Sequence, residues 1–306
     1  MIKIAAVLFL LLAVMALEAA GAEGSSGVPM REIDAGEILA KIQNGQPVIY
    51  DHVVVRGDLD LSRERLQKNI TSPIRINDSI FDSKINFNDA ILEMPIDLSG
   101  SNFSKNAYFR RTIFLGYAIF REATFSSNAY IGWASFRGGA VFEEATFSGY
   151  ADFERATFSV FADFEEVAFS GYANFLGTTF GSYASFKEAS FSGIADFCGA
   201  NFGGDTGFEE AIFIEVAGFE EAEFNGNIEF GDARFENETS FYRTLFRRPA
   251  YFENCSIESL NLTKAEYSRL HLRWDDIESL HFDEAAYLAL IKNYNTLGWY
   301  SDANDR

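Results

Sequence analysis

Five consecutive segments of eleven residues decide the fold of this chain: ANFLGTTFGSY (173–183), ASFKEASFSGI (184–194), ADFCGANFGGD (195–205), TGFEEAIFIEV (206–216) and AGFEEAEFNGN (217–227). Phe recurs in them at gaps of alternately five and six residues. The same spacing extends in both directions, and Ile131 replaces one Phe. The series is Phe109, Phe114, Phe120, Phe125, Phe136, Phe142, Phe147, Phe153, Phe158, Phe164, Phe169, Phe175, Phe180, Phe186, Phe191, Phe197, Phe202, Phe208, Phe213, Phe219, Phe224, Phe230, Phe235, Phe241, Phe246 and Phe252. A fixed internal repeat indicates stacked, similar units.

This spacing excludes a helix, because gaps of five and six residues would spread the Phe side chains over every face of a 3.6-residue turn. It fits short extended sides joined by turns, each sending its central residue inward. The residue two positions before most of these Phe is Ala, as in Ala151, Ala162 and Ala195, and the residues between are polar. A bulky ring and a small partner can fill a narrow tube without voids. The pattern therefore predicts an all-β solenoid.

The triplets Ala151-Asp-Phe153, Ala162-Asp-Phe164, Ala173-Asn-Phe175 and Ala195-Asp-Phe197 resemble the motif of the pentapeptide-repeat family. The resemblance covers roughly residues 76–262. It implies a right-handed quadrilateral β-helix with one pentapeptide per side. This chain departs from the family pattern by one extra residue at every second corner, as between Phe147 and Ala151. Two sides of five and two of six residues give 22 residues per coil, instead of the family's usual 20.

The turn residues test whether a coil holds 22 residues or 11. In every other eleven-residue unit, the second residue after the first Phe is acidic: Glu122, Glu144, Glu166, Glu188, Glu210 and Asp232. The intervening units follow no rule, with Arg111, Trp133, Arg155, Gly177, Gly199, Glu221 and Arg243. A coil of 11 residues would mix the two sets in one column. Their difference favours 22 residues per coil and an acidic stripe along one edge.

Residues 1–22 have the pattern of a cleavable signal peptide. Lys3 precedes an apolar run of about 14 residues, shorter than the roughly 20 that a membrane span requires, and small residues 20–22 follow. An uncleaved membrane anchor is the alternative. Residues 23–47 are predicted to form a linker and an N-terminal capping helix over 33–45, with Asp34 as N-cap, Glu37 completing a capping box and Gly45 at the end.

The β-helix is predicted to span residues 48–262, with an irregular strand over 48–61 and regular spacing from about residue 76. The interval from Ile76 to Ile257 holds about eight coils of this length. Residues 263–306 are predicted to form a helical cap. Its helix begins after Asp283, has Tyr287, Leu288, Ile291 and Tyr294 on one face and ends at Gly298. Residues 301–306 resemble the opening of a further helix, which leaves two alternatives: a truncated cap or a short frayed tail.

The residues contain no catalytic motif, no cofactor-binding motif and no metal-ligand spacing. The three His residues, His52, His271 and His281, share no metal-ligand spacing, and the last two lie in the predicted C-terminal cap. No nucleophile elbow or phosphate-binding loop is found. Cys198 and Cys255 differ in repeat phase and lie more than two coils apart, which predicts two isolated thiols instead of a disulfide. A non-enzyme that needs no cofactor is expected.

Two surfaces are candidates for interaction. The acidic stripe is open to three interpretations: a solubilising face, a weak site for cations or a basic partner, or, as the family resemblance implies for some members, a mimic of duplex DNA. The extra corner residues form the second candidate: Tyr150, Tyr172 and Ile194 on one edge, Phe161 and Tyr183 on the other. They form an exposed apolar ladder if they point outward, and core if they fold inward.

Together these features predict an exported rod, secreted or in the cell envelope, that serves as a structural or protein-interaction scaffold at the cell surface. Its partner is expected to be a protein, not a nucleic acid, and its net charge is −20. One alternative is an inhibitor that mimics DNA and occupies an enzyme such as a topoisomerase. The other is the ectodomain of a membrane protein, because members of the resembled family sometimes carry a membrane-spanning region after the repeats.

Overall fold

The computed structural model describes residues 29–62 and 69–304. The residues from Glu32 onward form one compact unit. The predicted signal peptide and most of the predicted linker lie outside the described residues.

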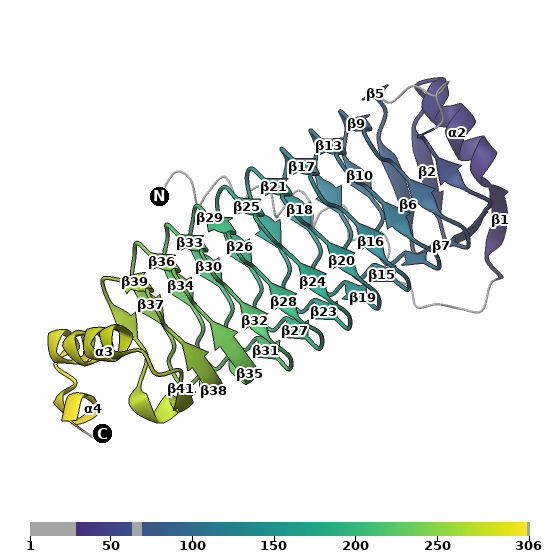
Figure 1. Cartoon of the computed structure of the whole chain (residues 1–306). Helices are drawn as coiled ribbons and strands as arrows, with labels where there is room; N and C mark the ends of the chain where they lie inside the picture. The colour runs from purple at the N-terminus through teal and green to yellow at the C-terminus, as the bar shows by residue number, and fades with distance from the viewer. Residues whose placement is uncertain (1–28, 63–68, 305–306) are drawn as a thin grey trace, which may run out of the picture. The chain divides into compact units, whose positions relative to one another are not determined.

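The unit is an all-parallel β-solenoid (Figure 1). Each regular coil contains four short strands, as in β20 (Ala151–Asp152), β21 (Thr157–Phe158), β22 (Ala162–Asp163) and β23 (Ala168–Phe169). One 11-stranded sheet, sheet B, covers one side and one 10-stranded sheet, sheet C, another, while the 20-stranded sheet A covers the remaining two. The predicted β-solenoid is confirmed, and its 11 strands in sheet B exceed the eight coils expected for residues 76–257, because flanking segments add coils.

The strands are short in all three sheets. Sheet B contains β2 (Val48–Asp51), β6 (Ile74–Asn77), β10 (Ile96–Asp97), β14 (Ala118–Ile119), β18 (Ala140–Val141), β22, β26 (Ala184–Ser185), β30 (Thr206–Gly207), β34 (Ile228–Glu229), β37 (Ala250–Tyr251) and β40 (Leu270–His271). Sheet C contains β5 (Asn69–Ile70), β9 (Ile91–Leu92), β13 (Ile113–Phe114), β17 (Ser135–Phe136), β21, β25 (Thr179–Phe180), β29 (Asn201–Phe202), β33 (Glu223–Phe224), β36 (Leu245–Phe246) and β39 (Glu266–Tyr267). Sheet A contains β1 (Arg31–Asp34), β3 (Val53–Arg56), β4 (Leu59–Asp60), β7 (Ile80–Phe81), β8 (Ile85–Asn86), β11 (Asn102–Phe103), β12 (Ala107–Tyr108), β15 (Thr124–Phe125), β16 (Ala129–Tyr130), β19 (Thr146–Phe147), β20, β23, β24 (Ala173–Asn174), β27 (Ser190–Phe191), β28 (Ala195–Asp196), β31 (Ile212–Phe213), β32 (Ala217–Gly218), β35 (Arg234–Ser240), β38 (Ser256–Asn261) and β41 (Ile277–Leu280).

The strand register confirms 22 residues per coil. Ala118 pairs with Ala140, which pairs in turn with Ala162, and this offset holds from β5 and β6 through the regular coils. The offset is 26 between Val48 and Ile74, because the first connection is longer, and it falls to 20 between Leu260 and Leu280. Each side therefore stacks on its equivalent in the next coil.

The core consists of stacked Phe rings, as the 5/6 spacing predicts. Phe142, Phe164 and Phe186 follow one another in three coils with ring centroids 4.9 Å apart and nearly parallel planes. Rings from different sides meet edge to face, as Phe153 meets Phe164 at 5.3 Å and 87°. Such pairs add about 0.5–1.5 kcal/mol each beyond the burial of their area.

Three threonines at the small inward positions, Thr112, Thr178 and Thr244, have a role that the spacing did not predict. Each hydroxyl donates a hydrogen bond to a backbone carbonyl of the neighbouring coil, as Thr178 Oγ1 does to the Phe153 oxygen at 2.8 Å. This hydrogen bond allows a polar side chain to replace Ala in a dry core.

The N-terminal helix α2 (Ala35–Gln43) is shorter than the predicted helix over 33–45, since Ile33 belongs to β1. Asp34 is its N-cap and accepts a hydrogen bond from Gly36 N at 2.7 Å. Glu37, expected to complete a capping box, instead accepts a hydrogen bond from the Tyr50 hydroxyl. The predicted strand over 48–61 is interrupted at His52 and Gly57, both with positive φ, and forms β2, β3 and β4.

The C-terminal helix α3 (Glu284–Leu297) has the predicted caps, Asp283 and left-handed Gly298. Its buried face consists of Ala286, Leu290, Asn293 and Tyr294. The expected placement of Leu288 on this face is wrong, because that side chain is 57% exposed. Residues 301–306 suggested the start of a further helix, and the structure has α4 (Tyr300–Asn304) there. A short 3-10 turn, η1 (Trp274–Asp276), lies earlier in the cap, before β41 and α3.

Removing one ring of the stack tests the origin of stability. We expect Phe164→Ala to lower the free energy of unfolding by about 3–5 kcal/mol, because it leaves a cavity between two stacked rings. The control Phe282→Ala, at a side chain that is 80% exposed, should change it by less than about 0.5 kcal/mol. Urea unfolding followed by circular dichroism measures both, and equal losses would contradict the proposed importance of the stack.

Candidate functional site

The six acidic residues of the predicted stripe, Glu122, Glu144, Glu166, Glu188, Glu210 and Asp232, occupy equivalent turns in successive coils. Their side chains are exposed. In the turn at Glu122, Ala123 N donates a hydrogen bond to the Phe120 oxygen at 3.1 Å, and the backbone N–H of Glu144 bonds Glu165 O in the next coil at 2.9 Å. The stripe is thus a column of turn residues whose backbone holds the coils together.

All six residues have φ between 56° and 59°, in the left-handed region. The intervening column lies in the same kind of turn, with Trp133 at 62°, Gly177 at 63° and Gly199 at 61°. Since L-residues other than Gly, Asn and Asp enter this region at a cost, the turn alone does not explain five glutamates.

Substitutions at one turn separate backbone strain from charge. We expect Glu166→Gly to leave the free energy of unfolding unchanged or raise it by up to about 1 kcal/mol, because Gly adopts positive φ without strain. Glu166→Val should lower it by about 1–2 kcal/mol, since a β-branched residue is disfavoured there. Thermal unfolding measures both variants. Equal stability of the Gly and Val variants would show that the turn does not require a left-handed residue.

The sheet B face beside the stripe is also acidic, and we name it the acidic face: Glu143, Asp163, Glu165, Glu209, Glu229 and Glu253. Burial, together with Asp163, Glu144 and Glu165, raises the pKa of Glu143, although Arg121 opposes the shift. Burial and the carboxylates of Glu209, Glu253 and Asp205 raise the pKa of Glu229 to about 7. Lys187 is one cation on this face, and it pairs with Glu188 at 2.8 Å.

The raised pKa of Glu229 makes stability depend on pH. Because its folded-state value lies above the usual 4.5, the folded chain binds this proton more tightly than the unfolded chain. The free energy of unfolding should therefore fall as pH rises from about 4.5 to about 7. We expect Glu229→Gln to be more stable than the natural chain at pH 8, with this advantage shrinking towards pH 5.

Unfolding by urea at a series of pH values measures this difference. The control is Glu258→Gln, at an exposed glutamate of β38 in sheet A. A Glu229→Gln profile parallel to that of the natural chain over this range would contradict the assignment.

The corner residues lie outside the core. Tyr150 and Tyr172 stack with ring centroids 5.5 Å apart, and Tyr172, Tyr183 and Ile194 are between 38% and 52% exposed. Phe161 is half-buried and leans over Gly139 towards Tyr117, with ring centroids 6.1 Å apart. From the sequence, the extra corner residue could either point outward or fold into the core. The structure places it outward, so both edges present apolar side chains.

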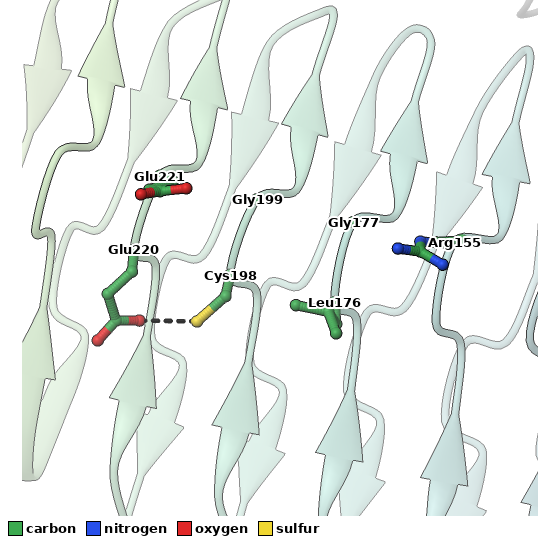
Figure 2. A pocket seen from close by; sticks show the side chains of 7 residues that line it. All are labelled: Arg155, Leu176, Gly177, Cys198, Gly199, Glu220 and Glu221. Atoms are coloured by element: carbon green, nitrogen blue, oxygen red, sulfur yellow. Dashed lines mark hydrogen bonds between the residues drawn. The ribbon is translucent and has the colours of Figure 1, made fainter.

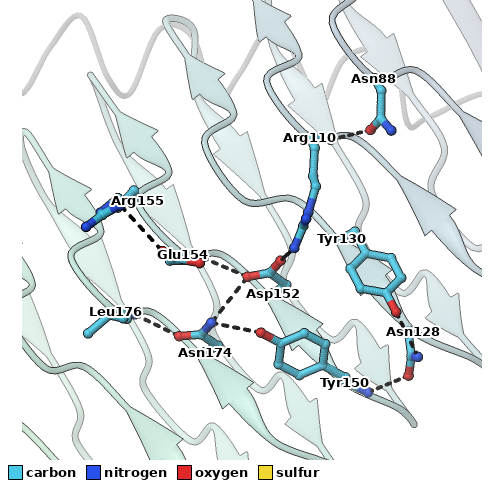
Figure 3. A network of polar contacts seen from close by, with 10 residues as sticks. All are labelled: Asn88, Arg110, Asn128, Tyr130, Tyr150, Asp152, Glu154, Arg155, Asn174 and Leu176. Atoms are coloured by element: carbon cyan, nitrogen blue, oxygen red, sulfur yellow. Dashed lines mark hydrogen bonds and ion pairs between the residues drawn. The ribbon is translucent and has the colours of Figure 1, made fainter. Parts of the chain in front are cut away.

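A polar network that spans four successive coils beside sheet A was not predicted (Figure 3). The Arg110 guanidinium reaches past Gly132 to the carboxylate of Asp152, whose side chain is fully buried. Asn174 donates hydrogen bonds to Asp152 at 3.3 Å and to the Tyr150 hydroxyl at 2.8 Å. One outward column changes from Tyr108 and Tyr130 to Asp152 and Asn174. This change was visible in the sequence, but periodicity does not show which distant side chain such a residue contacts.

A shallow depression of about 380 Å³ lies where Gly177 and Gly199 leave the turn column without side chains (Figure 2). Arg155 and Glu221 stand at its two ends, with Leu176, Cys198 and Glu220 beside it. The Cys198 thiol donates a hydrogen bond to Glu220 Oε2 at 2.8 Å. Burial, together with the carboxylates of Glu220 and Asp196, raises the pKa of Cys198, which keeps the thiol protonated and makes it a poor nucleophile.

Cys198 and Cys255 are both free thiols, in agreement with the prediction. Among the described residues, no group of three or more His, Cys, Asp or Glu side chains could hold a metal ion. No described helix is long and apolar enough to cross a membrane.

Comparison with known families matches a model described as pentapeptide repeats in nine copies to residues 87–132, 142–190, 164–212 and 199–245. The matched segments lie within the part of the chain that forms regular 22-residue coils. The chain belongs to the pentapeptide-repeat family. No curated protein matches this chain.

Membership assigns a role only in outline. The pentapeptide-repeat solenoid fits a structural or interaction role, and the family is generally non-catalytic. Candidate interaction surfaces of this pentapeptide-repeat chain include the acidic face with its stripe, and the two apolar edges at Tyr172 and Tyr183.

Proposed function

We propose that this protein is an exported pentapeptide-repeat rod that acts as a structural or protein-interaction scaffold at the cell surface. The observation that carries the proposal is the filled core: the regular coils are filled by their own Phe rings and the terminal coils by aliphatic side chains, and both sets are nearly inaccessible to solvent. The fold therefore needs no ligand, and its outward columns are available for contact. The proposed export rests on the signal-peptide pattern of residues 1–22.

The apolar edges support an interaction role. Tyr172 and Ile194 on one edge and Tyr183 on the other are large apolar side chains held on a rigid backbone. Rigid aromatic anchors bind with little loss of conformational entropy, which makes them common at protein interfaces. The spacing of the anchors follows the coil repeat of about 4.8 Å.

A second candidate is the DNA-mimicking inhibitor, which the acidic face and the net charge of −20 favour. Its targets would be enzymes in the cytoplasm. The signal-peptide pattern opposes it, because an exported chain does not meet such enzymes.

The mature N-terminus and the cell fraction of the native protein discriminate these functions. We expect mass spectrometry to find a start near Glu23 in the envelope or the medium. An intact Met1 in the cytoplasm would contradict the exported scaffold, and inhibition of a topoisomerase would then support the DNA mimic.

A photo-crosslinking amino acid at Tyr183 tests the interaction role in the native host. We expect a discrete crosslinked partner from this edge, and none when the same amino acid replaces Arg155, which is exposed in the turn between β20 and β21, away from both apolar edges. Identical products from both positions would indicate collisions instead of a binding surface.

A further inference from the structure

The C-terminal end of the solenoid closes its sheets unequally. Sheet B ends at β40, where the Asn293 side chain of α3 accepts a hydrogen bond from Leu270 N at 3.0 Å and donates one to Leu270 O at 2.8 Å. The side-chain amide thus makes the two hydrogen bonds to Leu270 that the backbone of a further coil would otherwise make. Sheet A ends at β41, which pairs with β38 on one edge (Figure 1). No described strand pairs with the other edge of β41.

A small apolar groove lies beside this edge. Its volume is about 220 Å³, and it is lined by Trp274, Ile277, Glu278, Leu280, Phe282 and Tyr287. Trp274 and Tyr287 meet edge to face at 6.1 Å and form an aromatic wall. Phe282 is 80% exposed and Leu288, on the outer side of α3, is 57% exposed. The volume of the groove is below the roughly 300–1,000 Å³ of small-molecule sites, and it suits one large apolar side chain.

An unpaired strand edge beside an apolar groove favours a particular kind of ligand. The edge offers backbone hydrogen bonds that only another extended chain can use in series, and the groove selects a side chain of that chain. In regular coils this edge is taken by the next coil, as β38 takes the edge of β35. An added strand would continue the same ladder.

The surrounding charge is acidic. Asp275, Glu278 and Glu284 are exposed around the groove. The nearby cation Arg273 already pairs with Asp302 at 2.7 Å and stacks on Trp299. A second copy of this chain would bring the same carboxylates to the interface, and like charges would repel. A basic partner matches this end better than self-association does.

We propose that β41 and its groove bind an extended segment of a partner protein, which joins sheet A as a further strand. The segment places one large apolar side chain in the groove and carries Lys or Arg next to Glu278. This inference rests on the proposed scaffold function and names one partner chemistry for it.

The test uses the full mature chain and a fluorescein-labelled heptapeptide library of the form Lys-Thr-Val-X-Val-Thr-Lys, where X is Leu, Ile, Phe or Tyr. We expect at least one member to bind with Kd below about 100 µM, as measured by fluorescence anisotropy. The same peptide with Pro in place of both Val residues should lose binding at least tenfold, because it lacks two backbone donors.

Variants of the chain locate the site. Glu278→Lys and Phe282→Ser should each weaken binding at least tenfold. Phe282 is so exposed that its loss should leave the fold intact, which circular dichroism confirms or excludes. The matched controls are Glu166→Lys on the acidic stripe and Tyr183→Ser on an apolar edge, and both should stay within twofold of the natural chain.

Three outcomes would overturn the inference. These are no binding by any library member, an equal loss with Glu166→Lys, or a dimer of the natural chain that Phe282→Ser dissolves in sedimentation experiments. The last would assign the groove to a second copy. Crosslinking from Tyr183 is independent of this end, so its persistence would leave the scaffold function standing when the peptide test fails.

Discussion

The stacking of inward Phe rings between coils is the interaction on which the rest of this structure depends. Rings such as Phe142, Phe164 and Phe186 repeat at 4.9 Å, close to the spacing of paired strands. The ring stack and the backbone ladder therefore have the same period, and neither strains the other. Ala at the inward position two before the ring leaves space for edge-to-face contacts across the tube. Core and backbone stabilise the same register.

That register turns single outward residues into columns. Because Glu144 and Glu166 occupy the same turn one coil apart, a charge that would be isolated on another fold joins a row of like charges. Burial first, and then the neighbouring carboxylates of Glu209 and Glu253, raise the pKa of Glu229 on the adjoining acidic face. The fold tolerates this repulsion because its stability comes from the core, so the surface can vary with little effect on the architecture.

A solenoid also leaves a problem at each end, where the ladder of backbone groups stops. Helix α2 packs at one end, and Asn293 replaces a missing coil at the other. The edge of β41 lacks an equivalent cover among the described residues, and exposed Phe282 lies beside it. Exposed edges invite pairing with other chains, which natural proteins usually prevent. An edge left open beside an aromatic groove is therefore a candidate for selective binding.

The sequence by itself determined the repeat, the inward Phe positions, the 22-residue coil and the capping residues Asp34, Asp283 and Gly298, because each depends on local spacing or local hydrogen bonds. Only the tertiary structure decided that Tyr183 points outward, that Arg110 reaches Asp152 past Gly132, and that Leu288 faces solvent. These outcomes depend on which side chains meet between coils, where one Gly or one extra corner residue changes the available space. A periodic pattern identifies equivalent positions, but contacts between non-equivalent side chains need coordinates.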